Sequence, residues 1–125
     1  PTPVASLAAT EGISSVVFRD ASRGAAFGGD FSHPDSVYAN LAMTVDGGAT
    51  WHLAGPVPLG GAVFGGATVP GTLTWVAVAP TGSAISTDDG MTWARIDSVN
   101  YWTVSAAGPD AVWAAGPGRI SRLSR

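Results

Sequence analysis

Two octapeptides hold the residues of this chain whose types and spacing could do chemistry. The stretch TVDGGATW runs from Thr44 to Trp51, and STDDGMTW runs from Ser86 to Trp93, 42 residues later. Both contain a hydroxyl side chain, an Asp, a Gly, a Thr and a Trp at matching positions. A carboxylate flanked by hydroxyls could ligate a metal ion, act as an acid or base, or hold a tight turn.

The turn is the favoured interpretation. A divalent cation in an oxygen site takes six or more ligands, and each octapeptide offers only one or two carboxylates, with no His or Glu close in sequence. We expect Asp46 and Asp88 to accept hydrogen bonds from backbone N–H groups one or two residues ahead, and Gly48 and Gly90 to adopt positive φ. We predict no metal site and no catalytic residue. The residues predicted to build the two turns are Thr44, Asp46, Gly48, Thr50, Trp51, Ser86, Asp88, Gly90, Thr92 and Trp93.

The composition excludes several classes of protein. Of the 125 residues, 46% are hydrophobic and 12% charged, so the chain can bury a core and is globular. The net charge of −3, with no Lys and six scattered Arg, argues against a nucleic-acid partner or an anionic membrane surface. Without Cys there is no disulfide, thiolate metal site or thiol nucleophile. No run reaches the roughly 20 apolar residues of a membrane-spanning helix. We predict no cofactor.

Seventeen Gly and nine Pro divide the chain into short apolar runs that are typical of β-strands. The first unit spans 13–54, with strands expected at 13–18, 24–29, 40–44 and 50–54. The second spans 62–97, with strands at 62–69, 73–79, 83–87 and 92–96. The third spans 101–123, with strands at 101–107, 111–116 and 119–123 and no fourth strand.

A repeat of 42 residues with four strands per unit predicts an all-β fold of β-propeller blades. Each blade is a four-stranded antiparallel sheet, and this chain supplies about three. The alternative is a β-sandwich of about eleven strands, which has no reason to repeat an octapeptide at equal spacing. We expect residues 1–125 to form a single partial propeller.

The octapeptides resemble the Asp-box, or bacterial neuraminidase repeat. This motif occurs in sialidases, sortilin-type receptors and photosystem II assembly factors. The segments VVFRD, GAAFGGD and VWAAGPGRISRL are similar to the C-terminal part of bacterial Asp-box propeller proteins, which are often labelled oxidoreductase-like. The resemblance implies that the box is a structural turn away from the ligand face. It also favours a periplasmic or secreted location.

Two functional classes follow from these observations. The first, which we prefer, is a non-catalytic scaffold or binding module that presents a rigid face to a protein or small ligand. The alternative is a glycan-active hydrolase or lyase of the sialidase type. Sialidases use an arginine triad and a Tyr–Glu pair, whereas the only Glu here is Glu11, and the Arg residues do not recur at equivalent places. No G-x-G-x-x-G follows a strand, so no dinucleotide site is indicated.

The candidate ligand site lies on the loop after the second expected strand. Long loops on rigid scaffolds often carry recognition, and Asp30, His33 and Asp35 could bind a metal or serve as acid and base. Tyr38 in the same loop, and Tyr101 and Trp102 in a later connector, could stack on a sugar or line a pocket. The alternatives are a solvated Ser/Pro/Asp loop and aromatics that begin a buried inner strand.

The missing fourth strand predicts a partner. Residues 1–9 include an apolar run, Thr2–Ala8, at the position where the outer strand of a preceding blade belongs. We expect this run to complete the third blade of a second copy in a strand-exchanged homodimer of six blades. The other possibility is a fragment that pairs with the remainder of a longer parent chain, and the start at Pro1 leaves room for a longer N-terminal part. Two classes of ligand for this chain stay open, a protein and a glycan.

Overall fold

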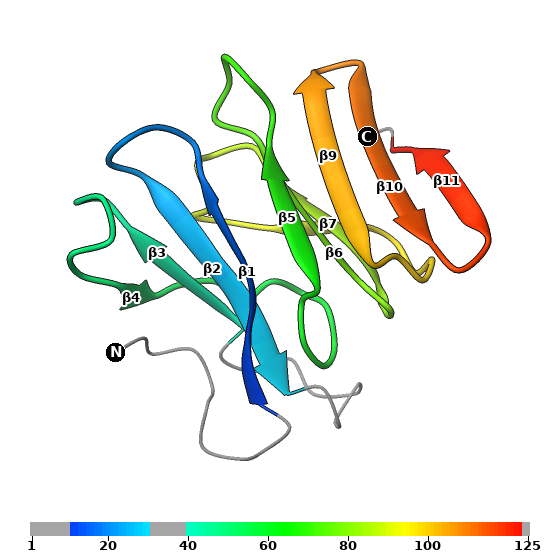
Figure 1. Ribbon diagram of the computed structural model, residues 1–125, viewed down its shortest axis with the longest axis horizontal. Coiled ribbons are helices and arrows are strands. Elements are labelled where there is room, and N and C mark those ends of the chain that lie inside the picture. Colours follow the sequence, from blue (N-terminus) through cyan, green and yellow to red (C-terminus); the bar gives the residue numbers. More distant parts are fainter. Residues whose placement is uncertain (1–10, 31–39, 124–125) are drawn as a thin grey trace.

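The computed structural model describes residues 11–30 and 40–123 (Figure 1). In this part of the chain, eleven strands form three antiparallel sheets of four, four and three strands. The all-β class predicted from the sequence is therefore confirmed. Three separate sheets also rule out the two-layer β-sandwich that was the alternative.

Each sheet is built from consecutive strands, so neighbours in the chain are also neighbours in the sheet. The first sheet contains β1 (Glu11–Phe18), β2 (Gly24–Asp30), β3 (Leu41–Thr44) and β4 (His52–Leu53). The second contains β5 (Gly65–Thr68), β6 (Trp75–Ala79), β7 (Gly82–Ser86) and β8 (Ala94–Asp97). The third contains β9 (Thr103–Gly108), β10 (Ala111–Gly116) and β11 (Arg119–Arg122), with β11 at its outer edge.

Several strands are shorter than the sequence predicts, and β4 and β5 differ most from the expected lengths. Strand β4 does not include residues 50 and 51, because the backbone N–H of Thr50 donates to the Asp46 carboxylate at 2.9 Å. Strand β5 does not include residues 62–64, and Val63 donates its N–H to the carbonyl of Gly28 in the first sheet at 2.8 Å. Residues expected in strands therefore form a turn in one case and a contact between sheets in the other.

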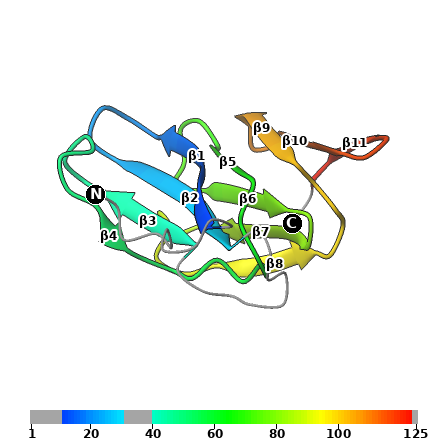
Figure 2. The ribbon, with the colours of Figure 1, turned by 60° about the horizontal axis from the view of Figure 1, so that its bottom comes forward.

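The second sheet is apolar on both faces and packs between the other two (Figure 2). Successive side chains of a strand point to opposite faces. Trp75 and Ala77 of β6 accordingly belong to the core shared with the first sheet. Val76 and Val78 belong to the core shared with the third sheet. Full burial of each Val contributes roughly 1.5–3 kcal/mol, so the apolar run of β6 holds three sheets together.

A buried amide fastens the connection between the first and second sheets. Asn40, which is fully buried, donates from its Nδ2 to the carbonyls of Val57 at 2.8 Å and Leu59 at 3.3 Å. Its Oδ1 accepts the backbone N–H of Val57 at 2.9 Å. All of these atoms would be costly to bury without partners. The connector is thereby fixed against the start of β3.

The three sheets are arranged radially. Strands β1, β5 and β9 line one side of the molecule, whereas β4 and β8 lie on the opposite side (Figure 2). Strand β5 contacts both β1 and β9. First strands that meet at the centre and fourth strands at the periphery are the arrangement of propeller blades.

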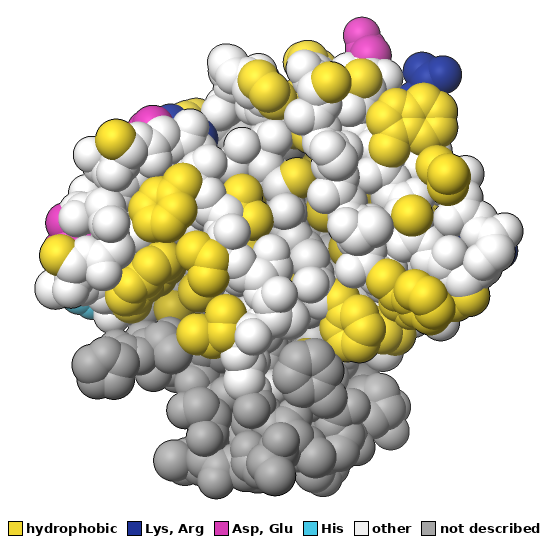
Figure 3. All heavy atoms as spheres, in the orientation of Figure 1, with side chains coloured by type: hydrophobic (Ala, Val, Ile, Leu, Met, Phe, Trp, Pro, Cys, Tyr) yellow, Lys and Arg dark blue, Asp and Glu magenta, His cyan; other side chains and the backbone are white. Residues whose placement is uncertain are grey.

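Two sheet faces remain open at the ends of the row. On the first sheet, Ile13, Val16 and Phe18 are exposed, and on the third sheet Trp113 and Ile120 are exposed. Hydrophobic side chains gather over both ends of the molecule in Figure 3. In the two junctions between sheets that the structure contains, the corresponding faces are packed against a neighbour.

Candidate functional site

The first octapeptide forms a tight turn between β3 and β4, built around one carboxylate. Asp46 accepts hydrogen bonds from the Thr44 hydroxyl at 2.7 Å, and from the backbone N–H of Thr50 at 2.9 Å and its hydroxyl. The Thr44 hydroxyl oxygen accepts the backbone N–H of Gly48 at 3.0 Å. Gly48 has a φ of 97°, a conformation that favours glycine.

The second octapeptide repeats this geometry between β7 and β8. Asp88 accepts from the Ser86 hydroxyl and from the backbone N–H of Thr92, each at 2.8 Å, and from the Thr92 hydroxyl. Ser86 accepts the N–H of Gly90 at 2.8 Å, and Gly90 has a φ of 86°. In both turns the N–H that the carboxylate binds comes from the Thr four residues ahead. The expected bond to an N–H one or two residues ahead is therefore replaced by a longer-range one.

These hydrogen bonds favour the ionised form of both carboxyl groups. The Thr50 hydroxyl and N–H, followed by the Thr44 hydroxyl, lower the pKa of Asp46 to about 2. The Thr92 hydroxyl and N–H, followed by the Ser86 hydroxyl, lower the pKa of Asp88 to about 2. A carboxyl group with so low a pKa holds its proton poorly at neutral pH, so it is poorly suited to act as a general acid.

The tryptophan that closes each octapeptide lies against a phenylalanine. Trp93 packs edge-on to Phe27 of the first sheet, with ring centroids 6.2 Å apart, and its Nε1 donates to the carbonyl of Gly90 at 3.1 Å. Trp51 packs edge-on to Phe18 of its own sheet, with centroids 6.1 Å apart. The second box thus joins two sheets, and the first lies at the open face.

Asp89 has a role that sequence analysis missed. Arg19 donates two hydrogen bonds of 2.9 Å to its carboxylate, and Arg23 donates one of 3.0 Å. The indole Nε1 of Trp75 also donates to it at 3.0 Å. Burial alone would raise the pKa of Asp89, but the bonds from Trp75, Arg19 and Arg23 outweigh it and lower the pKa.

One signal in the sequence could have indicated this contact. The first box has Gly47 where the second has Asp89, and both residues have positive φ, 72° and 62°. A non-glycine residue in that conformation is uncommon, so a charged side chain there calls for a partner. The partners Arg19 and Arg23 lie about 70 residues earlier in the chain, which is why spacing alone does not reveal them.

The predicted ligand residues are only partly within the described chain. His33, Asp35 and Tyr38 lie outside it, and for Asp30 only the backbone in β2 is described. The two later aromatics, Tyr101 and Trp102, lie within it.

Tyr101 is buried, with a relative exposure of 3%, and its hydroxyl donates to the Asp97 carboxylate at 3.3 Å. Burial first, and then the charge of Asp97, raise its pKa. Tyr101 thus packs in the core two residues before β9, which begins at Thr103 and not at residue 101 as expected. Trp102 is 53% exposed. Ligand binding by these residues stays a prediction.

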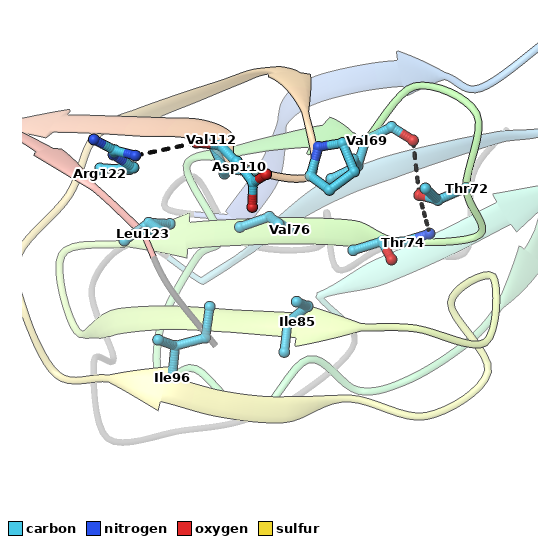
Figure 4. Close-up of a pocket in the computed structure, with 11 residues that line it drawn as sticks. Val69, Thr72, Thr74, Val76, Ile85, Ile96, Asp110, Val112, Arg122 and Leu123 are labelled. Atoms are coloured by element: carbon cyan, nitrogen blue, oxygen red, sulfur yellow. Dashed lines mark hydrogen bonds between the residues drawn. The ribbon is translucent and has the colours of Figure 1, made fainter.

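A groove of about 470 Å³ separates the second and third sheets (Figure 4). One wall comes from the second sheet, where Val76, Ile85 and Ile96 lie on the consecutive strands β6, β7 and β8. The other wall includes Val112 of β10 and Leu123, the residue after β11. Thr72, Thr74, Asp110 and Arg122 add polar groups around it.

The described residues contain no group of three or more His, Cys, Asp or Glu that could hold a metal ion. They also contain no helix that could cross a membrane.

Successive four-stranded sheets, packed face to face with a box turn before the outer strand, define part of a β-propeller. No protein-family model and no curated protein matches the sequence. Among solved structures, the chain is similar to YCF48 bound to a D1 peptide, with a TM-score of 0.68 and 22% sequence identity. The match covers 91% of this chain and 38% of the YCF48 chain. This likeness shows the fold, and the chain spans well under half of the protein it matches.

Proposed function

We propose that this chain is a binding module: part of a β-propeller that engages a protein or peptide through its open sheet surfaces. The observation that carries the proposal is the pair of open apolar faces. Ile13, Val16 and Phe18 are 43%, 54% and 41% exposed at one end, and Trp113 and Ile120 are 46% and 76% exposed at the other. Large exposed apolar side chains gathered on one surface are typical of an interaction site.

The comparison with YCF48 supports the same proposal. That protein is a solved propeller described as bound to a D1 peptide, and the present chain has the fold of part of it. A propeller scaffold places its loops and edges rigidly, which lowers the entropy that binding costs. Peptide binding by this chain is consistent with that rigidity.

The partner that closes the open faces can come from two sources. A second copy would bring two open faces against two others and give a closed ring of six blades. Residues 1–9, which lie outside the described part of the chain, would then complete the third blade of the partner copy. Alternatively, the remainder of a longer parent chain would supply the missing blades.

The mass of the chain in solution tests this proposal. We expect light scattering at increasing concentrations to give a mass approaching twice the 12.5 kDa of one chain. Val16→Glu places a charge on the open face of the first sheet and should shift the mass back to that of one chain. The matched control is Met91→Glu, at a position that is 79% exposed in the second box turn, beside the junction of the first two sheets.

If the wild-type chain stays at 12.5 kDa and neither open face captures the missing blades added as a separate polypeptide, the proposal is wrong. Capture of those blades without self-association would favour the parent-chain source over the second copy.

A further inference from the structure

The junction between the first two sheets shows what a box tryptophan does in this fold. Trp93 packs against the core between these sheets together with Met43 and Ala54. The turn at Gly90 places Trp93 against the first sheet. This turn lies so close to that sheet that a side chain added at Gly90 would meet the sulfur of Met43 at 2.5 Å. The wall that receives the indole therefore comes from the preceding sheet.

Strand register identifies the same place at the next junction. In the first sheet Ala25 pairs with Met43, one residue before the ladder ends at Thr44. In the second sheet Val76 pairs with Ile85 at the equivalent position, one residue before the ladder ends at Ser86. Ile96 is equivalent to Ala54 by the pairing of the preceding residues. Val76, Ile85 and Ile96 are the residues that line one wall of the groove. The groove is thus the counterpart of the place that Trp93 occupies.

In the part of the chain that the structure describes, the third sheet has no box at this junction. The hairpins β6–β7 and β10–β11 share their register, with Ala79 opposite Gly82 and Gly116 opposite Arg119. Leu123 consequently lies at the position of Ser86, and its N–H donates to the carbonyl of Val112 at 2.9 Å. A leucine has no hydroxyl to anchor the turn that Ser86 and Thr44 anchor. Within the described residues, no strand pairs with the outer edge of β11.

We propose that the groove and the outer edge of β11 together bind an extended peptide strand that carries an aromatic residue. This inference rests on the proposed function and specifies its ligand. The strand would pair with β11 through the backbone, as in other cases of strand addition. Its aromatic side chain would enter the groove between Ile85, Ile96 and Leu123. A Trp or Tyr ring buries enough apolar area to anchor such a peptide.

The groove continues an interface that already exists. Val76, Val112 and Leu123 belong both to the core between the second and third sheets and to the wall of the groove. An inserted ring would therefore extend that core. Residues 1–9 contain no aromatic residue, so they match the strand edge but not the groove. This difference favours an aromatic strand from a partner over the N-terminal segment of a second copy.

The polar groups beside the groove indicate which residues should flank the aromatic side chain of the bound strand. The Arg122 guanidinium lies over the Trp113 ring, 5.5 Å from its centroid, and donates to the backbone carbonyl of Asp110 at 3.5 Å. Both Arg119 and Arg122 are exposed on β11. We therefore expect the bound strand to be acidic, as the segment around Trp93 is with Asp88, Asp89 and Asp97.

A peptide from this chain tests the proposal. Residues 86–98, STDDGMTWARIDS, contain the box, Trp93 and the following strand. We expect calorimetry to detect binding of this synthetic peptide to the full-length chain. Replacing Trp93 by Ala in the peptide alone should weaken binding about tenfold or more, as for other buried aromatic anchors. A fluorine label on the peptide indole should also change its NMR shift on binding.

Two variants of the chain locate the site. Ile85→Trp fills the groove from the second sheet, and Ile96→Glu places a charge in it, so each should weaken binding of the 86–98 peptide about tenfold. The matched control is Leu53→Glu on β4, an exposed position on the outer strand of the first sheet. It should bind the peptide as the wild-type chain does. Circular dichroism establishes that each variant is folded, and either groove variant suffices if the other does not fold.

The outcomes are distinguishable. Equal binding by the groove variants and Leu53→Glu would overturn the groove assignment while leaving the binding module intact. Binding of a peptide of residues 1–10 in place of the aromatic peptide would favour strand exchange and overturn the aromatic specificity. If no peptide binds and the chain captures no partner, both the groove assignment and the proposed function are wrong.

Discussion

At the scale of single residues, the box carboxylates do structural work that depends on their charge. Asp46 and Asp88 each collect three hydrogen bonds from the backbone and hydroxyl groups of their own turn. Because the bonds favour the ionised form, the pKa of each falls to about 2 in the folded chain. An unfolded Asp titrates near 3.9.

The first prediction is a loss of stability in acid. A carboxyl group whose pKa is lower in the folded chain stabilises it above the unfolded pKa, and this contribution is lost as the pH falls through the folded pKa. Melting temperature measured against pH should therefore be level above about pH 5 and fall between about pH 4 and pH 2. The double variant Asp46→Asn, Asp88→Asn should have a melting temperature lower by on the order of 5 °C at pH 7. Its melting temperature should also fall less as the pH is lowered. Parallel pH curves for the two proteins would contradict this origin.

The second prediction concerns the carboxylate between sheets. Asp89→Ala leaves the guanidinium of Arg19 and the indole N–H of Trp75 without their acceptor. We expect a loss of about 1–3 kcal/mol of unfolding free energy, measured by urea denaturation. Asp110→Ala, at an exposed position, serves as the control and should change it little. A loss for Asp89→Ala no larger than for the control would show that the contact contributes nothing to stability.

At the scale of elements, close approach of the sheets depends on a glycine. A side chain at Gly66 of β5 would meet the Phe27 ring at 2.2 Å, and Phe27 is fully buried. Phe27 also lies against Trp93, so it has little room to shift. The equivalent position in the first sheet is held by Val16, which faces outward. Gly66 is therefore required where a neighbouring sheet packs on this face.

The third prediction follows from that packing. Gly66→Ala should lower the unfolding free energy by about 1–3 kcal/mol, because overpacking forces Phe27 out of place. Gly12→Ala on β1 is the matched control, since a side chain there meets no atom within 4 Å. Thermal denaturation of the two variants measures the difference. Equal melting temperatures would mean that the first two sheets can separate slightly without cost.

At the scale of the whole molecule, the two open faces make the chain incomplete as a propeller. If two copies close a ring, each copy uses both faces. Val16→Glu and Ile120→Glu each damage one face, so neither variant should dimerise alone. In a mixed dimer, the Val16→Glu chain contributes an intact third-sheet face and the Ile120→Glu chain an intact first-sheet face. These two intact faces meet, so an equimolar mixture contains one undamaged interface. This yields the fourth prediction: light scattering of the mixture should give a larger mass than either variant by itself. A mixture that behaves like its components would contradict closure by a second copy.

The sequence predicted the repeating architecture because its signals are local. Short continuous apolar runs define strands such as β6 and β10. The box places Asp46 only four residues from the Thr50 N–H that it binds. It did not predict that Trp51 lies outside strand β4, because the turn and the strand compete for the same backbone groups. The loop residues His33, Asp35 and Tyr38 remain a hypothesis from sequence alone.

By itself, the sequence determined the all-β class, the strand order within each sheet and the two box turns. All of these depend on residues that are close in the chain. Only the tertiary structure decided which faces meet. It joined Asp89 to Arg19 across 70 residues, buried Tyr101, and placed Ile85, Ile96 and Leu123 around one groove. The reason is physical: contacts between sheets depend on how strands stack in space, and side-chain spacing along the chain carries no record of that stacking.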